Sequence, residues 1–222
     1  MAASTDKAQQ DDIIAAAIAF ARDFHEKDDT GHDWWHIQRV SKMTERLAEA
    51  EGANRFVALL AALLHDVADE KLNESKESGL RRVQSWLESQ PVAAADCGHV
   101  IEIISTMSYN AGLNPPMRTL EGQVVQDADR LDAIGAIAIA RCFLYAGKIG
   151  DPIHDPGIKP RDSITKEQYR NEGSTAINHF YEKLLKLKDR INTPSAKAIA
   201  EERHRYMERY VTQFHAEWDG LL

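Results

Sequence analysis

A histidine and an aspartate at the end of a long apolar run are the residues best suited to chemistry. His65 and Asp66 directly follow the run Ala58–Leu64, which should form a buried helix. Burying an imidazole beside a carboxylate costs several kcal/mol of desolvation unless a partner compensates for it. A divalent metal ion is the simplest such partner, because both side chains are metal ligands. The pair therefore predicts a metal site, and a hydrogen-bonded pair without a metal is the alternative interpretation.

The His-Asp dipeptide alone is weak evidence, because it occurs three times in the chain. The three copies are His32-Asp33, His65-Asp66 and His154-Asp155. The first precedes a predicted helix that Asp33 would cap, and the last lies between two prolines in a predicted loop. Only the middle copy ends an apolar helix, so its context singles it out.

Two other segments offer further metal ligands. His36 lies in the first turn of the second predicted helix, and three carboxylates, Asp127, Asp129 and Asp132, cluster on an otherwise apolar helix. Asp129 and Asp132 are one turn apart and share a face of that helix. Acids on buried helices are uncommon, so this cluster makes a metal-free interpretation of the His-Asp pair much weaker.

The order His, His-Asp, Asp on successive helices resembles the HD-domain phosphohydrolase superfamily, in which four such residues hold one divalent metal in an all-α bundle. The resemblance places the ligands at His36, His65, Asp66 and Asp129, because Ala128-Asp129 is similar to the alanine–aspartate step of the family. Over roughly residues 10–218 the chain resembles the YpgQ/YedJ-like subgroup. The segments that carry this likeness are 31–40, 64–71, 127–141, 183–188 and 200–204.

The resemblance implies a metal-dependent phosphohydrolase that acts on nucleotide phosphates, with pyrophosphohydrolase activity on nucleoside triphosphates. A nucleotidase or phosphodiesterase of the same fold is the alternative, as is a metal- or nucleotide-binding sensor without turnover. Hydrolases of guanosine alarmones carry an asparagine four residues after the last ligand, where this chain has Ala133. This difference disfavours an alarmone substrate.

The predicted ligand set also limits the metal. Two imidazoles and two carboxylates suit manganese, or magnesium, iron, cobalt or nickel, better than a structural zinc, which favours thiolates. Four protein ligands on a six-coordinate ion leave positions for water and a phosphate oxygen, so the metal would activate water for attack on phosphorus. Two-metal HD proteins usually carry extra histidines before the last aspartate. Only His99 lies there, so we expect one metal.

Two further acids follow the His-Asp pair. Asp69 and Glu70 lie three and four residues beyond Asp66, so on a continuing helix at least one faces the same cleft. We expect one of them to orient or deprotonate the attacking water, and the resemblance favours Asp69. A solvated helix end is an equally good interpretation of both.

Contacts to the substrate are predicted at cationic, acidic and aromatic positions close to the ligands in the sequence. The cations would bind phosphate, and an indole could stack on a base. For the arginines a structural ion pair with the ligand carboxylates is an equal alternative, and for the tryptophan core packing is favoured. These predicted contacts are Trp34, Arg39, Lys71, Arg130 and Asp132.

Helical periodicity without strand signals predicts an all-α fold. We expect residues 1–10 to be a flexible N-terminus and residues 11–220 to form a single HD-domain helical bundle, with an HD core over about 28–147 and C-terminal helices over about 165–218. A Gly/Pro-rich loop at about 150–164 separates these parts. The expected helices are about 11–27, 33–52, 55–69, 77–89, 97–107, 119–147, 175–188 and 195–218.

Composition limits the partners of this chain of 222 residues. A net charge of −8 argues against nucleic-acid binding, and no run of about 18 apolar residues predicts a membrane span. The cysteines, Cys97 and Cys142, form no disulfide framework or CxxC site. The first residues lack the layout of a signal peptide, so we expect a cytoplasmic protein. Its expected partner is a small-molecule nucleotide, and a homodimer is left open.

Overall fold

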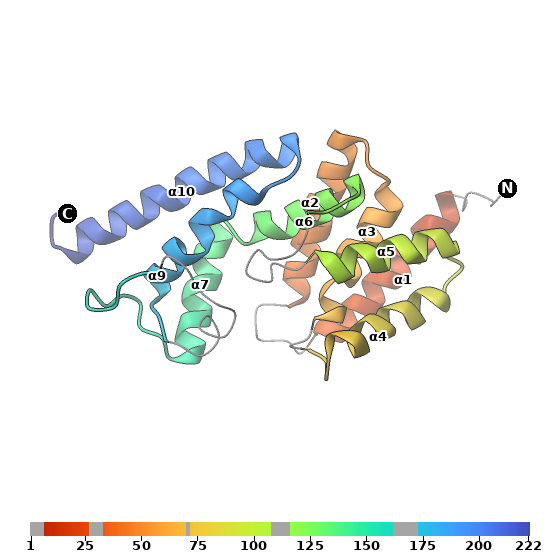
Figure 1. Cartoon of the computed structure of the whole chain (residues 1–222), viewed down its shortest axis with the longest axis horizontal. Helices are drawn as coiled ribbons and strands as arrows, with labels where there is room; N and C mark the ends of the chain where they lie inside the picture. The colour runs from red at the N-terminus through yellow and green to blue at the C-terminus, as the bar shows by residue number, and fades with distance from the viewer. Residues whose placement is uncertain (1–6, 27–32, 70–71, 108–115, 162–172) are drawn as a thin grey trace. The chain divides into compact units, whose positions relative to one another are not determined.

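The computed structural model describes residues 7–26, 33–69, 72–107, 116–161 and 173–222. All regular structure in these residues is helical, so the predicted all-α fold is confirmed (Figure 1). The chain forms two compact units, Met1–Tyr109 with Asn114–Ala128 and Asn110–Leu113 with Asp129–Leu222. Among the described helices, none is long and apolar enough to cross a membrane.

The first unit is built around α3 (Arg55–Leu64), in which every residue after Arg55 is buried. A helix that is apolar on all sides must be covered on all sides, and α3 packs against α1, α2 and α5. A further helix, α4, packs on α5. The surrounding helices are α1 (Lys7–His25), α2 (Trp34–Glu51), α4 (Lys76–Glu88), α5 (Ala94–Thr106) and the start of α6 (Leu120–Asp132).

The end of α3 differs from the prediction. The helix stops at Leu64 instead of continuing to Asp69, and a 3-10 turn, η1 (Asp66–Ala68), follows it. In this turn the amide of Asp69 donates to the carbonyl of Asp66, and Asp69 itself is extended, with ψ 133°. The continuous helix expected over 55–69 is therefore wrong, because the chain tightens to 3-10 hydrogen bonding just where the His-Asp pair lies.

The turn η1 is fitted closely against α4. Gly79 of α4 is buried, and a Cβ atom there would lie 2.8 Å from the Cα atom and the carbonyl oxygen of Ala68. The N-terminus of α4 is fixed by a capping box in which the Ser75 hydroxyl accepts from the Ser78 amide and the Ser78 hydroxyl accepts from the Ser75 amide. The glycine therefore lets α4 approach the backbone of η1.

The helix expected over 119–147 is two helices. The first, α6, ends at Asp132, and α7 (Ala136–Ile149) begins after Gly135, whose φ of +89° is a conformation that favours glycine. A Cβ atom on Gly135 would also lie 3.0 Å from the Cγ atom of Arg203. The prediction of one helix is wrong because this single glycine turns the chain inside a run of small apolar residues.

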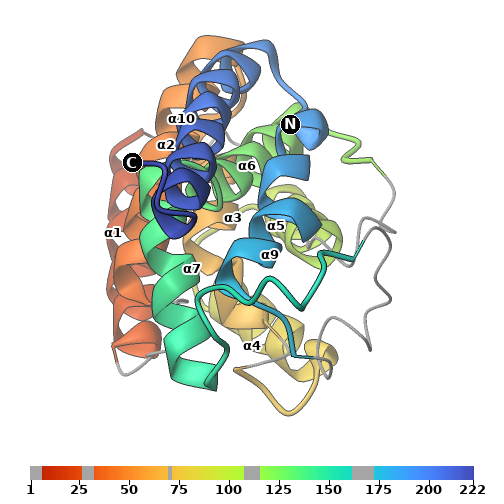
Figure 2. The same cartoon turned by 90° about the vertical axis from the view of Figure 1, so that its left-hand side faces the viewer.

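The second unit places α10 (Pro194–Trp218) against α7, and α7 against α9 (Ala176–Glu182) (Figure 2). Aromatic rings pack together in this unit: the buried Phe180 stacks on Tyr210 with ring centroids 5.9 Å apart, and the ring centroid of Phe143 lies within 6.2 Å of both. The helix expected over 175–188 is shorter than predicted. It ends at Glu182, and the 3-10 turns η3 (Leu184–Lys186) and η4 (Lys188–Arg190) follow.

A buried carboxylate secures α9 to the preceding loop. The Glu182 side chain is 1 % exposed, and Arg161 donates to it from Nε at 2.9 Å, from the second guanidinium nitrogen at 2.9 Å and from its backbone amide at 3.1 Å. The Ser174 hydroxyl donates to the same group. Burial raises the pKa of Glu182, but the hydrogen bonds and charge of Arg161 outweigh burial and hold it below the ordinary 4.5.

Replacing Glu182 by glutamine should lower the free energy of unfolding by about 1–3 kcal/mol at neutral pH, because charged hydrogen bonds are lost inside the unit. Since the folded pKa is lowered, the wild-type advantage is present above pH 4.5 and disappears as the pH falls through that lowered value. Urea unfolding of both proteins at neutral and acid pH would measure it.

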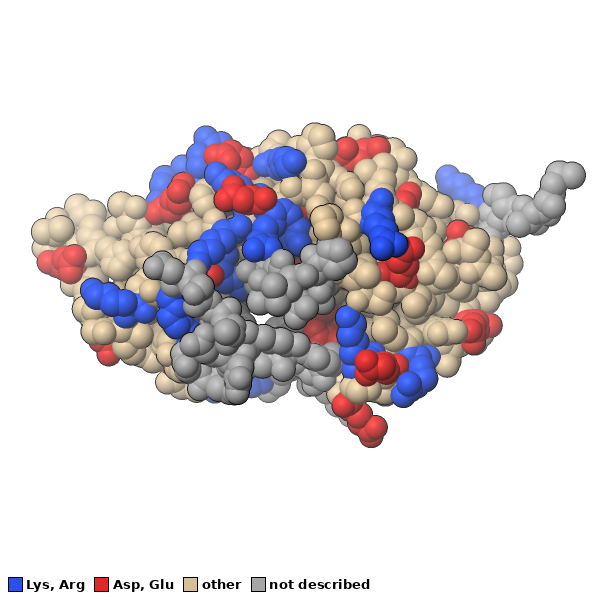
Figure 3. Space-filling view, viewed as in Figure 1, with Lys and Arg blue, Asp and Glu red and all other residues tan. Residues whose placement is uncertain are grey.

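The matched control is Glu201→Gln. Glu201 is 50 % exposed and pairs with Lys188 at 3.2 Å. Figure 3 shows acidic and basic side chains interspersed on the face in view. Such a surface pair contributes about 0–1 kcal/mol. Equal losses of stability in the two variants would contradict the role given to Glu182.

Candidate metal centre

Three buried side chains of the first unit converge at the end of α3. Asp66 lies between two imidazoles: its Oδ2 atom is 3.4 Å from Nε2 of His36, and its Oδ1 atom is 3.2 Å from Nε2 of His65. The ligand atoms of all three residues lie within 4.8 Å of one another. The structure therefore brings together three of the four predicted metal ligands, His36, His65 and Asp66.

The position of His36 follows from the start of α2. Asp33 is the N-cap, as predicted, and its carboxylate accepts from the backbone amide of His36 at 2.8 Å. This cap fixes the first turn of the helix, where the His36 side chain is buried. The packing of α2 on α3 then brings His36 to His65, with ring centroids 5.5 Å apart.

A backbone contact sets the orientation of His65. Its Nδ1 atom lies 2.8 Å from the carbonyl oxygen of Ala62, an acceptor, so Nδ1 carries a proton and donates it. In the neutral ring Nε2 then presents a lone pair toward the Asp66 carboxylate, and two acceptors face each other at 3.2 Å. Only a cation between them, a proton or a metal ion, makes this approach favourable.

These observations fit a divalent cation. Two imidazole nitrogens and a carboxylate oxygen are ligands that divalent first-row metals accept, and the contact from Nδ1 of His65 to a backbone carbonyl is the usual support for an Nε2 ligand. Within the described part of the chain, these side chains converge as a metal site requires.

Asp129 lies on the other side of the boundary between the units. It is half-buried on α6, in the first residues of the second unit. Its neighbours Asp127 and Asp132 are buried, and Asp132 accepts from Arg141 at 2.7 Å. Asp129 as the fourth ligand therefore stays a prediction, supported by its place on this helix.

The predicted substrate contacts have varied surroundings. Trp34 and Arg39 are half-buried on α2, and Arg39 lies one turn beyond His36, on the same face. In the second unit, Arg130 donates to the backbone carbonyl of Arg190, and Asp132 is paired with Arg141. Both residues therefore have contacts within the second unit, and their predicted contacts with the substrate stay predictions. The remaining contact, Lys71, lies outside the described residues, as does the second predicted acid, Glu70.

Asp69, the favoured catalytic acid, ends the 3-10 turn that begins at Asp66. Residues three apart in such a turn are eclipsed, so the side chain of Asp69 starts from the same side of the turn as that of Asp66. The predicted α-helix that would carry Asp69 is wrong, but the 3-10 turn supports the expectation that Asp69 lies on the same side as Asp66. Asp69 is half-buried.

Two residues that support the site carried no signal in the sequence analysis. Asn73 donates from Nδ2 to the carbonyl oxygens of Val67 and Asp69, at 2.8 and 2.9 Å. Arg203 of α10 donates to the carbonyl of Leu131, two residues after Asp129. An asparagine after an acidic turn and an arginine on an amphipathic helix are too common to reveal such tertiary contacts.

Comparison with known proteins places this arrangement in a family. The HD domain model matches residues 34–134. YpgQ of Bacillus subtilis is 37 % identical over 194 residues, which are 86 % of this chain and 87 % of YpgQ. The structure of YpgQ in complex with ADP has a TM-score of 0.75 and covers 94 % of this chain and 96 % of that one.

Two further solved structures are similar. An HD-superfamily hydrolase of Bacillus thuringiensis has a TM-score of 0.77 and 50 % identity, covering 95 % of this chain and 98 % of its own. A protein of Lactobacillus plantarum has a TM-score of 0.83 and 44 % identity, covering 98 % and 100 %. The likeness therefore extends over both units of the chain.

Proposed function

The chain belongs to the HD-domain superfamily and is a phosphohydrolase, and from this premise we propose that it converts nucleoside triphosphates into nucleoside monophosphates and pyrophosphate. The observation that carries the proposal is the convergence of His36, His65 and Asp66 within 4.8 Å. The complex of YpgQ with ADP supports a nucleotide as the substrate class. A cytoplasmic location and a homodimer stay predictions.

In this proposal the cation is held by His36, His65 and Asp66, and Asp129 of α6 completes the set. When bound, one divalent ion, with manganese as the first candidate, supplies Lewis acidity to the phosphoryl group and to a water molecule. The carbonyl of Ala62 keeps His65 in the tautomer that presents Nε2.

Asp69 takes the proton in the proposed reaction. Water attacks the α-phosphorus, the bond to the bridging oxygen breaks, and pyrophosphate leaves with that oxygen. The proton released by the water passes to the carboxylate of Asp69, which the 3-10 turn carries on the same side as Asp66. Trp34 and Arg39 of α2 are the proposed contacts to base and phosphate in the first unit, and Arg39 shares its helix face with His36.

Product analysis tests this function. Purified protein with Mn²⁺ is incubated with nucleoside tri-, di- and monophosphates and with a phosphodiester, and phosphate and pyrophosphate are measured separately. We expect pyrophosphate and monophosphate in equal amounts from triphosphates, and none after chelation. Orthophosphate alone would indicate a nucleotidase, cleavage of the diester a phosphodiesterase, and no product at all a sensor.

A further inference from the structure

The side chain of Asn73 closes the loop that follows the His-Asp pair. Its amide nitrogen donates two hydrogen bonds, to the carbonyl oxygen of Val67 at 2.8 Å and to that of Asp69 at 2.9 Å. Two carbonyl acceptors within this distance fix the orientation of the amide, because only its nitrogen can donate. One side chain thus joins the middle and the end of the segment that carries Asp66 and Asp69.

The segment from Asp66 to Asp69 needs the Asn73 hydrogen bonds because it has few hydrogen bonds within itself. The turn η1 is three residues long, and its own hydrogen bonds are those from Ala68 to His65 at 3.3 Å and from Asp69 to Asp66 at 3.1 Å. Bonding of this 3-10 type has poorer geometry than an α-helix. Val67 is fully buried, so its carbonyl group is far from solvent and depends on a protein donor.

Helix α4 contacts η1 at Ala68 and fixes that part of the turn. Asp69, at the end of the turn, is the residue whose position can change. Gly79 of α4 lies so close to Ala68 that the backbone of the turn is in contact with the helix there. Asp66, at the other end of the turn, is separated from α3 only by His65. Among the described residues of the following loop, the Asn73 amide at 2.9 Å and the Leu72 amide at 3.1 Å donate to the carbonyl oxygen of Asp69 and help to fix its position.

We propose that Asn73 is a positioning residue, which holds the turn Asp66–Ala68 and the backbone of Asp69 so that the Asp69 carboxylate is aligned with the attacking water. This inference rests on the proposed function. It assigns Asn73 no contact with substrate. A displacement of about 1 Å at a catalytic group can cost about 100-fold in rate, so loss of these two hydrogen bonds should lower turnover.

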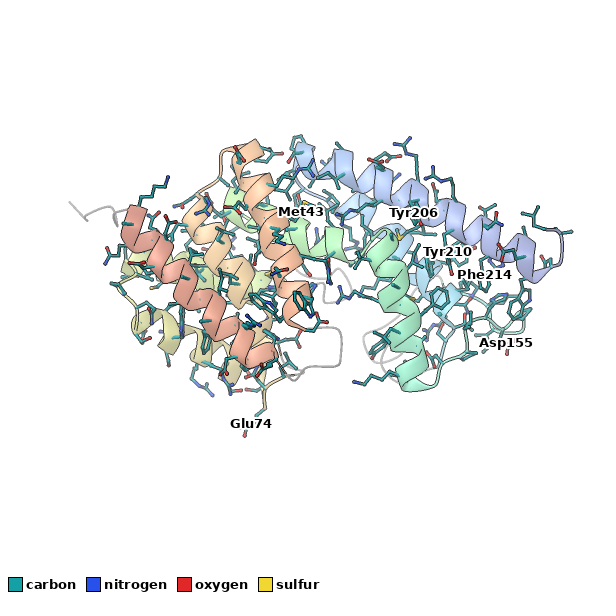
Figure 4. The ribbon with its side chains drawn as sticks, turned by 180° about the vertical axis from the view of Figure 1, so that it is seen from behind. Met43, Glu74, Asp155, Tyr206, Tyr210 and Phe214 are labelled. Atoms are coloured by element: carbon teal, nitrogen blue, oxygen red, sulfur yellow. The ribbon has the colours of Figure 1, made fainter. Side chains whose placement is uncertain are left out.

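The test is the isosteric substitution Asn73→Asp, which removes both donors and sets a carboxylate against two carbonyl oxygens. Asn73→Ala removes the donors without adding charge. The control is Glu74→Gln, an exchange between acid and amide at the next residue, whose side chain points outward from the loop (Figure 4). Each protein is measured by hydrogen exchange, by urea unfolding, by Mn²⁺ titration of the metal-free form and by kcat and KM for nucleoside triphosphates.

We expect faster exchange of the Ala68 and Asp69 amides in both Asn73 variants. The kcat of Asn73→Asp should fall by about 10- to 100-fold, and that of Asn73→Ala by less, with KM and Mn²⁺ affinity unchanged. Glu74→Gln should behave as the wild type.

Four results would overturn the inference: unchanged exchange, faster exchange with unchanged kcat, a fall in Mn²⁺ affinity as large as the fall in kcat, or loss of cooperative unfolding in both Asn73 variants. The last would show a purely structural residue. A wild type that hydrolyses no nucleotide would overturn the proposed function instead. The exchange comparison needs no turnover, so it still decides whether Asn73 holds the turn.

Discussion

Replacing Asp66 by alanine should abolish metal binding and leave the helical fold in place. The Asp66 carboxylate lies between the two imidazoles, with one oxygen toward each Nε2 atom, so its removal takes away the only anionic ligand of the described cluster. Two neutral imidazoles without it retain a divalent cation poorly. We expect the Mn²⁺ affinity to fall by more than about 100-fold, the upper range for loss of an outer-shell partner.

The fold should survive this change because Asp66 lies beyond the apolar part of α3. The residues from Phe56 to Leu64 form the core of the first unit, and none of them contacts solvent appreciably. Removing the carboxylate also removes its desolvation penalty, which offsets part of the lost interactions. Metal analysis after dialysis against Mn²⁺ measures the first effect, and far-ultraviolet circular dichroism with thermal unfolding measures the second.

Asp12→Ala is the control for this experiment, because Asp12 is an exposed carboxylate of α1 in the same unit. It should retain the metal content of the wild type. If Asp66→Ala keeps its metal as well, the cation is bound elsewhere and the assignment of His36, His65 and Asp66 fails.

Local signals were sufficient where a helix is controlled by its own residues. The predicted bounds of α2 were within one residue of the structure, because Asp33 caps its start and Gly52 adopts the left-handed conformation, φ +73°, that ends it. The same signals failed at Gly135. Gly135 lies in a run of small apolar residues with strong helical periodicity. The side chain of Arg203, which is distant in the sequence, lies close to the position that a Cβ atom on Gly135 would take.

The candidate metal site also has features that local sequence signals predicted and features that depend on tertiary contacts. Burial of His65 and Asp66 followed from the apolar run before them, and the capping role of Asp33 placed His36 in the first turn of its helix. The 3-10 turn after Leu64 could not be predicted from these residues. It depends on the donor that Asn73 brings back to Val67 and on the approach that Gly79 allows, both of which exist only after folding.

Replacing Asp69 by asparagine should remove most of the activity without removing the metal. The variant is isosteric but accepts no proton, so we expect kcat to fall by about 10²- to 10⁴-fold, the usual contribution of a general base. The backbone carbonyl of Asp69, which Asn73 and Leu72 contact, is unchanged by the substitution. The turn should therefore keep its shape, and the loss should come from the carboxylate alone.

Kinetics together with metal analysis separate this effect from that of Asp66→Ala. Asp69→Asn should keep the Mn²⁺ affinity and the KM of the wild type, because Asp69 is outside the converging cluster of metal ligands. Glu70→Gln is the companion variant, since Glu70 is the alternative base. Full activity in Asp69→Asn with a large loss in Glu70→Gln would transfer the role to Glu70. A parallel loss of metal and activity in Asp69→Asn would make Asp69 a metal ligand instead of a base. The roles of Asp66 and Asp69 are therefore distinct only if Asp66→Ala removes the cation and Asp69→Asn leaves it bound.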